Sequence, residues 1–138
     1  MQKLYIEPTR VTPEINFSPS ENIFIIRGNS SPEDVRAMYY PVIEWIKIFV
    51  EDALEGEFPQ FSKSSPVRFQ TDLEYFNSSS AKFFFDIFME LKRLILKDIP
   101  VVVEWYYDVE DVDQKEAGAD ISLLVEMDFT FQPKNIKK

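Results

Sequence analysis

Three consecutive serines, Ser78, Ser79 and Ser80, are the residues of this chain whose type and spacing most directly offer chemistry. They follow Asn77 and separate an alternating, strand-like segment from a long apolar segment with helical spacing. The first turn of a helix has unpaired backbone N–H groups and a partial positive charge, so it accommodates a capping serine or a phosphate. One serine suffices as the cap, so at least one hydroxyl is free to be phosphorylated, which adds about −1.5 to −2 charge. The residues alone do not choose among the three serines.

A group of carboxylates between Asp108 and Asp113 is the second candidate for chemistry. Asp108, Glu110 and Asp113 could supply a general acid and base, as in a glycosidase, if the fold brought them together in a cleft. A divalent-cation loop is not indicated, because Val112 occupies a ligand position counted from Asp108 and no glycine stands at the sixth place. A solvated acidic loop is the favoured interpretation.

Composition excludes most catalytic machinery. The chain has no cysteine and no histidine, which removes thiol nucleophiles, imidazole bases and the metal sites that depend on these ligands. Its three glycines, Gly28, Gly56 and Gly118, are scattered and form no phosphate-binding loop. We therefore expect a protein that is not an enzyme and that has no cofactor and no metal site.

The net charge of −9 is concentrated near the C-terminus. Residues 104–128 contain nine carboxylates and only one basic residue, Lys115. Such a segment repels phosphate backbones, which disfavours nucleic-acid binding and favours a basic protein partner. We expect the partner surface to include Glu110, Asp111 and Asp113, together with the aromatic side chain of Tyr40.

Length and hydropathy indicate one compact domain over residues 1–138, in which 134–138 form a flexible basic tail. The 138 residues, 45% of them hydrophobic, can bury one core and hardly a second. No run approaches the roughly 18 apolar residues of a membrane span, and the N-terminus lacks a signal-peptide pattern. We expect a cytoplasmic protein that does not insert into membranes.

The N-terminal half predicts strands over 4–6, 15–17 and 23–26, with a turn at 18–22. A helix starts with Ser31 as its N-cap, Pro41 interrupts or restarts it, and an amphipathic stretch then continues to Gly56. Residues 58–66 form a loop.

The C-terminal half begins with a strand over 67–75, whose strict alternation places Tyr75 on the buried face. A helix covers about 79–97, and a strand over 101–107 is apolar enough to be covered on both faces. An acidic loop over 108–118 precedes a short helix near Asp120 and a final strand from Val125. This order predicts an α/β domain with a mixed β-sheet, helices packed on it and right-handed crossovers.

The chain resembles the small bacterial biofilm-regulation phosphoproteins of the SiaC type almost from end to end. The resemblance rests most specifically on Glu74-Tyr75-Phe76-Asn77-Ser78-Ser79-Ser80-x-Lys82, and also on Tyr40-Pro41-x-x-x-Trp45 and Val103-x-Trp105-Tyr106-Tyr107-Asp108. The serine junction is also similar to the phosphorylation site of anti-sigma-factor antagonists, which implies a STAS-like fold. Gly118-Ala119-Asp120 departs from the usual Gly-Glu-Asp of the family.

The resemblance implies regulation by partner switching. A dedicated protein kinase would phosphorylate the first residue after the asparagine, which is Ser78 here, and a PP2C-like phosphatase would reverse the reaction. Asn77, Ser79, Ser80 and Lys82 would support this junction. The unphosphorylated form would bind a downstream protein, in SiaC-type systems a diguanylate cyclase.

Two other classes of protein stay open at this point. An acidic structural adaptor without a phosphoswitch would have all three serines engaged in backbone hydrogen bonds. A carboxylate-based enzyme would have Asp108, Glu110 or Asp113 converging in a cleft.

Overall fold

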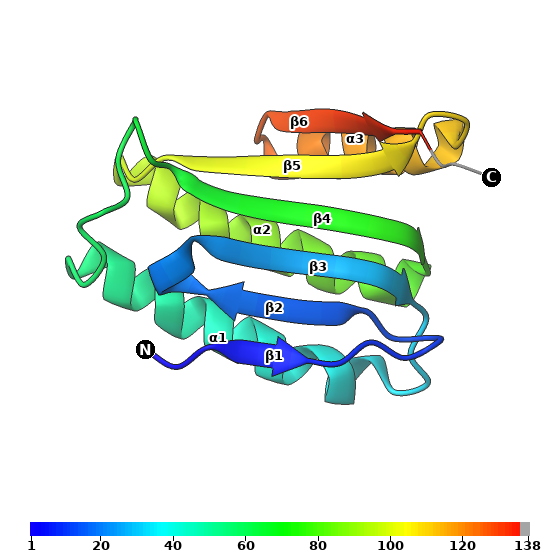
Figure 1. Cartoon of the computed structure of the whole chain (residues 1–138), viewed down its shortest axis with the longest axis horizontal. Helices are drawn as coiled ribbons and strands as arrows, with labels where there is room; N and C mark the ends of the chain where they lie inside the picture. Colours follow the sequence, from blue (N-terminus) through cyan, green and yellow to red (C-terminus); the bar gives the residue numbers. More distant parts are fainter. Residues whose placement is uncertain (136–138) are drawn as a thin grey trace.

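The computed structural model describes residues 1–135 and contains a six-stranded sheet whose strands lie side by side in chain order (Figure 1). Three helices and one short 3-10 turn connect them. The elements are β1 (Leu4–Ile6), β2 (Glu14–Ser18), η1 (Pro19–Glu21), β3 (Ile23–Ser30), α1 (Val35–Leu54), β4 (Val67–Phe76), α2 (Ser78–Leu96), β5 (Val101–Asp108), α3 (Val112–Val125) and β6 (Phe129–Lys134).

The sheet is mixed, as predicted. β1, β2 and β3 pair antiparallel, whereas β3 to β6 are parallel and are linked by α1, α2 and α3 in turn. Parallel crossovers are right-handed, and each one here leads to the next strand in the same direction, so all three helices must cover the same face. Figure 1 shows them together behind the sheet. The predicted single α/β domain is confirmed, and the STAS-like comparison remains a prediction.

The core lies between the helices and the covered face of the sheet. β4 buries Val67, Phe69, Thr71 and Leu73 at alternate positions, as the sequence predicted. Aromatic pairs join the two layers, since Phe24 lies 5.0 Å from Phe49 of α1 and Phe69 lies 5.8 Å from Phe88 of α2, measured between ring centroids. Among residues 1–135, no helix has the combination of length and apolar character that crossing a membrane requires.

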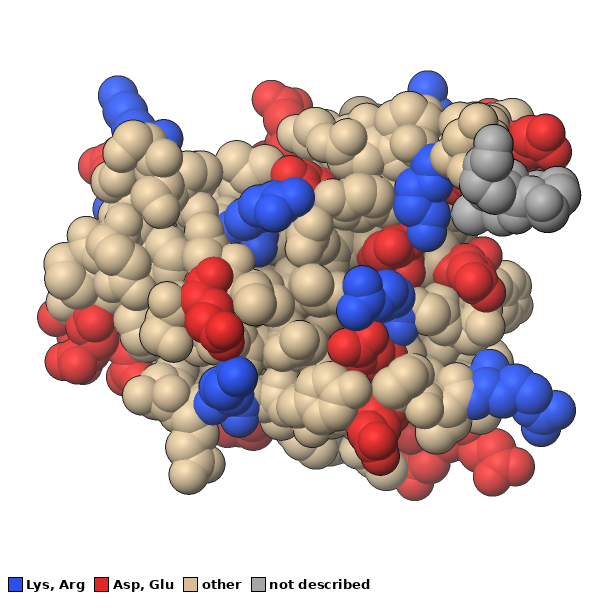
Figure 2. Space-filling model, in the orientation of Figure 1, with Lys and Arg blue, Asp and Glu red and all other residues tan. Residues whose placement is uncertain are grey.

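The other face of the sheet is open and polar, so the prediction that the strand over 101–107 is covered on both faces was wrong. Figure 2 shows acidic and basic side chains interspersed on this face. In β5 only Val103 and Trp105 are fully buried, because one-sided crossovers leave the alternate residues without a helix above them.

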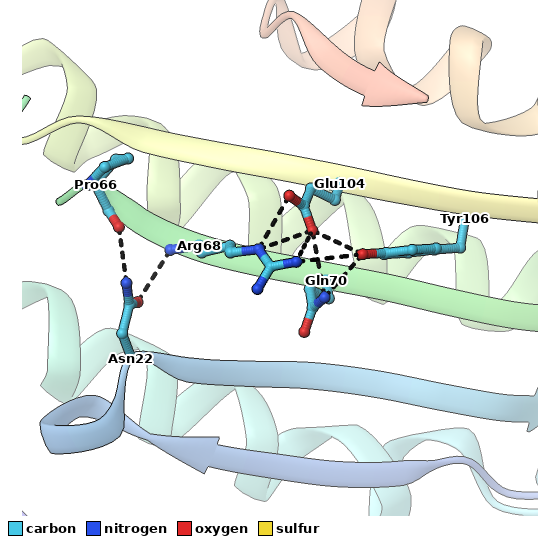
Figure 3. Close-up of polar contacts among 6 residues, drawn as sticks. All are labelled: Asn22, Pro66, Arg68, Gln70, Glu104 and Tyr106. Carbon is cyan, nitrogen blue, oxygen red and sulfur yellow. Dashed lines mark hydrogen bonds and ion pairs between the residues drawn. The ribbon is translucent and has the colours of Figure 1, made fainter. Parts of the chain in front are cut away.

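A network around Glu104 organises the open face (Figure 3). Its carboxylate accepts hydrogen bonds from Arg68 Nε at 3.0 Å and Tyr106 Oη at 2.9 Å, and from Gln70 Nε2 at 3.3 Å. Burial acts to raise the pKa of Glu104, but the hydrogen bonds from Arg68 and Tyr106 outweigh it and hold that pKa below its ordinary value. The carboxylate is therefore ionised at neutral pH and fully partnered.

The first helix begins later than predicted, runs through Pro41 without a break and ends at Leu54, two residues before the predicted end at Gly56. Its N-cap is Asp34, whose carboxylate accepts the N–H of Ala37 at 3.1 Å, whereas the backbone N–H of Ser31 bonds to Val11. Pro41 lies inside a continuous α1 and does not interrupt it. A proline in a helix interior costs about 3 kcal/mol, and packing of the buried residues on both sides, Tyr39 and Val42, offsets that cost.

Tyr75 is exposed, contrary to the prediction from alternation. The pairing of β3 with β4 shifts by one residue, because Gly28 pairs with Leu73 while Asn29 pairs with Tyr75. Such a bulge reverses the faces of the residues that follow it. Phe76 therefore turns inward, and its ring centroid lies 5.3 Å from that of Phe84 in α2.

The predicted acidic loop over 108–118 is mostly helix. α3 begins at Val112, and Asp111 caps it by accepting the N–H of Gln114 at 3.0 Å. The helix continues to Val125, so the final strand starts at Phe129 and not at Val125. Gly118 allows α3 to approach β5, because a Cβ atom there would lie 2.5 Å from the Trp105 ring.

Lys134 does not belong to a flexible tail, contrary to the prediction. Lys134 is the last residue of β6, and its ammonium lies 2.6 Å from the Asp72 carboxylate of β4. The rest of the predicted tail, at 136–138, lies outside the described residues.

We expect Gly118→Ala to lower the free energy of unfolding by about 1–3 kcal/mol, because the added methyl group collides with the indole. Helix propensity alone predicts the opposite sign, a gain of about 1 kcal/mol. Urea denaturation measures the difference. The matched control is Ala119→Gly at the neighbouring exposed position, which should cost about 1 kcal/mol from propensity alone. A stabilised Gly118→Ala variant would contradict the packing.

Candidate functional site

Parallel strands bring the functional residues to one edge of the sheet. The carboxyl ends of β3, β4 and β5 lie together, and each is followed by the N-terminus of a helix. This is the edge at which open α/β sheets place their binding sites. The three helix N-caps, Asp34, Asn77 and Asp111, all belong to it. Residues far apart in the chain, such as Ser30, Ser78 and Asp111, therefore meet around the α2 N-terminus.

The N-cap of α2 is Asn77, not one of the serines. Its side-chain oxygen accepts the backbone N–H of Ser80 at 2.9 Å, and its own N–H donates to the carbonyl of Ser30 at 3.0 Å. The second bond ties the start of α2 to the end of β3. Because Asn77 performs the capping, Ser78 is the first residue of the helix and is not needed as a cap.

Ser80 belongs to a buried chain of hydroxyl groups, all in residues with no solvent exposure. Its Oγ receives a hydrogen bond from Ser30 Oγ at 2.7 Å and donates to the Ser30 carbonyl at 3.1 Å. Ser30 Oγ also lies 2.6 Å from Tyr39 Oη in α1. Since the Ser30 hydroxyl donates its hydrogen bond to Ser80, Tyr39 must be the donor in the contact with Ser30. Burial raises the pKa of Tyr39, although bonds to Ser30 and Ser80 lower it in part, so the phenol keeps its proton.

Ser78 and Ser79 are exposed, and within residues 1–135 neither side-chain oxygen makes a hydrogen bond. This contradicts the adaptor hypothesis in the form that engaged all three serines. Ser78 lies in an open recess, which we call the Ser78 recess, between β4, α2 and the start of α3. Its lining is Glu74, Tyr75, Phe76, Asn77, Ser78, Asp111, Asp113, Gln114 and Ala117.

The predicted acidic residues separate into different places. Asp111 and Asp113 line the Ser78 recess, where Glu74 of β4 joins them. Asp108 lines a neighbouring pocket with Asp72 and Lys134, and Glu110 lines neither of the two. Asp108, Glu110 and Asp113 therefore do not converge as a carboxylate enzyme would need. Within the described part of the chain, no group of three or more potential ligands is placed to hold a metal ion.

Tyr40 and Lys82 lie on a different surface, which we call the α1–α2 groove. Its lining is Tyr40, Ile43, Glu44, Lys47, Lys82, Phe83 and Asp86. The Tyr40 side chain is exposed, and its ring centroid lies 5.9 Å from that of Phe83. The Lys82 ammonium lies 2.7 Å from the Asp86 carboxylate and 5.2 Å from the Phe83 ring centroid. The groove thus begins one helical turn beyond Ser78.

Sequence reasoning did not find Ser30, Tyr39 or Glu74 as parts of the site. Glu74 reaches the Ser78 recess because of the bulge in β4, which has no clear sequence signal. Ser30 bonds to Ser80 across 50 residues of sequence, and Tyr39 joins them through its contact with Ser30, so the crossover topology brings the three hydroxyls together.

Comparisons with known proteins agree with this geometry. The model of the SiaC family of regulatory phosphoproteins matches residues 6–134. An uncharacterized protein of Pseudomonas aeruginosa strain UCBPP-PA14 is 29% identical over 108 residues, which are 78% of each chain. Among solved structures, the chain is similar to apo-SiaC from Pseudomonas aeruginosa, with a TM-score of 0.81, 26% identity and coverage of 96% of this chain and 99% of that one.

The chain is equally similar to SiaC in a second structure, that of the diguanylate cyclase SiaD in complex with its activator SiaC from Pseudomonas aeruginosa. There the TM-score is 0.81 and the identity 25%, with coverage of 95% of this chain and 99% of that one.

The hydroxyl chain should make substitution of Ser80 destabilising, whereas substitution of Ser79 should hardly change the free energy of unfolding. Ser80→Ala leaves the buried Ser30 hydroxyl without an acceptor, so we expect a loss of about 1–3 kcal/mol in the free energy of unfolding. Tyr39→Phe should cost about 0.5–1.5 kcal/mol. The control Ser79→Ala, at an exposed position, should stay within about 0.5 kcal/mol of the parent. Urea denaturation of the three variants decides, and equal stability of the Ser79 and Ser80 variants would refute the arrangement.

Proposed function

The chain belongs to the SiaC family of regulatory phosphoproteins, and we propose from that premise that it works by partner switching: reversible phosphorylation of Ser78 controls its binding to a downstream protein. The observation that carries the proposal is the exposed Ser78 hydroxyl in a junction that is held together without it. The fold keeps its cap through Asn77 and its anchor through Ser80. A modification at Ser78 therefore changes the surface and leaves the framework intact.

The three serines differ in their suitability as acceptors. Ser80 is buried and its hydroxyl already donates to the Ser30 carbonyl, so a kinase would have to open the core to reach it. Ser79 is exposed but does not line the Ser78 recess. Ser78 is both exposed and part of the recess, which supports it as the residue whose phosphate a docked partner would meet.

The chemistry of the switch is supplied by other proteins. In the kinase reaction the Ser78 oxygen bonds to the γ-phosphorus of ATP, ADP leaves, and the serine proton passes to the kinase's base. The PP2C-like phosphatase hydrolyses the ester with water, which restores the serine and releases inorganic phosphate. In the chain itself the candidate catalytic carboxylates Asp108, Glu110 and Asp113 do not line one pocket, which supports a binding role and not a catalytic one.

A phosphate on Ser78 would add about −1.5 to −2 charge beside a recess already lined by Glu74, Asp111 and Asp113. A partner whose basic side chains contact these carboxylates would have to move away from the surface to make room for the phosphate. If it did not move away, docking would remove most of the water that solvates the phosphate. Loss of close contact and desolvation of the phosphate both oppose binding. The unphosphorylated form is thus the one that binds.

We propose a diguanylate cyclase as the downstream partner. The support is the similarity to SiaC in its complex with the cyclase SiaD, which spans nearly the whole of this chain. An activator of that kind does its work by contact, so it needs a modifiable surface and no catalytic residues of its own. Kinase, phosphatase and cyclase domain would then meet this protein in the cytoplasm.

Partner binding should respond to charge at position 78. We expect Ser78→Ala to bind the diguanylate cyclase of its own organism as the unmodified chain does, and Ser78→Asp to bind about 10–100-fold more weakly. Calorimetric titration measures the affinities, and melting temperatures should barely change, since an acid is tolerated at a helix start.

The matched control is Ser79→Asp, which adds the same charge next to the recess and should weaken binding less. Mass spectrometry after incubation with the cognate kinase should find the phosphate on Ser78. Phosphate confined to Ser79, or equal affinity of the Ser78→Ala and Ser78→Asp variants, would remove the basis of the switch.

The acidic recess should accelerate association with a basic partner surface. Asp111→Asn with Asp113→Asn should lower the association rate constant about 3- to 10-fold at low ionic strength, and asparagine preserves the cap of α3. Added salt should reduce the difference, because exposed charges are screened over about 8 Å at physiological ionic strength. Glu110→Gln, outside the recess, is the matched control. Association rate constants from stopped-flow that change neither with salt nor with the double substitution would contradict a role of this acidic surface in partner association.

A further inference from the structure

We propose that Lys82 is the residue that binds the phosphate on Ser78, exchanging its ion pair with Asp86 for one with the phosphate and so transmitting the modification to the α1–α2 groove. This inference deepens the proposed function and rests on Ser78 being the phosphorylated residue. It concerns where the phosphate goes and what its arrival changes elsewhere on the surface.

The geometry of α2 places Lys82 within reach of Ser78. The two residues are four positions apart in one continuous helix, so they are neighbours on its surface. Side chains in a helix lean toward its N-terminus, which favours a Lys82 side chain turned toward Ser78. In the unmodified chain, where Ser78 carries no charge, the Lys82 ammonium instead lies 2.7 Å from the Asp86 carboxylate on the next turn.

The phosphate competes favourably with Asp86 for two reasons. It carries about twice the charge of a carboxylate. An acid placed four residues before a lysine also makes a better helical ion pair than an acid placed four residues after it. The existing pair has the weaker order, and both partners are partly exposed, with side-chain exposures of 69% and 34%. Such a pair contributes little and is easily exchanged.

The surroundings push the phosphate in the same direction. The carboxylates that face Ser78 across the recess are Glu74 from β4 and Asp111 and Asp113 from α3, and no lysine or arginine lines the recess. Repulsion from these acids disfavours a phosphate turned into the recess. Lys82 lines the α1–α2 groove and not the recess, and from there it offers the counter-charge.

The consequence for the groove is a change of charge. Its lining has two acids, Glu44 and Asp86, and two lysines, Lys47 and Lys82. When Lys82 turns to the phosphate, the groove loses one positive charge, Asp86 loses its partner, and the ammonium leaves the face of Phe83. The phosphorylated and unmodified forms then differ on two surfaces, the Ser78 recess and the α1–α2 groove.

The test uses the full chain with phosphoserine incorporated at position 78 during translation, so it needs neither kinase nor partner. In a phosphorus NMR titration at low salt, we expect the second ionisation of the phosphate to occur about 0.5 pH unit lower than in the same protein with Lys82→Met, because a nearby cation favours the dianion. Lys82→Arg should restore most of the shift. Lys47→Met, which removes a groove lysine from α1, should leave the titration unchanged.

A second measurement follows the Lys82 ammonium resonance directly. In the unmodified chain, Asp86→Asn should shift this resonance, and in the phosphorylated chain it should not. Identical phosphate titrations with and without Lys82, or an Asp86→Asn effect that persists after phosphorylation, would overturn the exchange. Either result leaves the Ser78 switch itself standing, whereas weak or absent dependence of partner binding on Ser78 would remove the switch and leave the ion-pair result intact.

Discussion

The handedness of the crossovers constrains everything else in this structure. Three parallel connections, each leading to the adjacent strand, must cross on the same side if all are right-handed. The helices therefore form a single layer, and their N-termini gather at one edge with Asp34, Asn77 and Asp111 as caps. The uncovered face is open to solvent, and some of its polar groups also pair across the strands, as Glu104 does with Arg68 and Tyr106. The topology thus separates the edge that holds the helix N-termini from the open polar face of the sheet.

At the shared edge, the structure divides the three serines between two tasks. Ser80 accepts a hydrogen bond from Ser30, and Ser30 accepts one from Tyr39. One continuous chain of hydrogen bonds therefore joins β3, α1 and α2. Buried polar chains of this kind are stable only when every member is partnered, and this one is. Ser78 sits two residues earlier and takes no part in it. The buried hydroxyl chain thus holds the start of α2, and with it the exposed Ser78, in a fixed orientation.

Much of the fold could be predicted because hydrophobic periodicity records which face of an element is buried. The alternation of Val67, Phe69 and Leu73 and the spacing along α2 located those two elements to within one residue at their ends. Periodicity failed where a tertiary contact decided the outcome. Val112 to Gly118 looked like an acidic loop because α3 has little amphipathic character, and its position depends on Gly118 fitting against Trp105. The site was predicted as far as it is local: Asn77 and the serines are contiguous, whereas Glu74, Ser30 and Tyr39 join them only through the bulge and the crossovers.

Asn77 capping α2 has a consequence for how such proteins can diversify. Among the described residues, the side chain at position 78 makes no hydrogen bond on which folding depends, so under the proposed switch its identity would be set by the enzymes that act on it and by the partner that contacts it. Serine, threonine or alanine should occupy the position at nearly equal stability, so under the proposed switch duplicated copies could acquire separate kinases, or lose the regulation, through single substitutions. Under the proposed switch, the separation of one signalling pathway from another would then depend on recognition by kinases and partners and not on the stability of the fold.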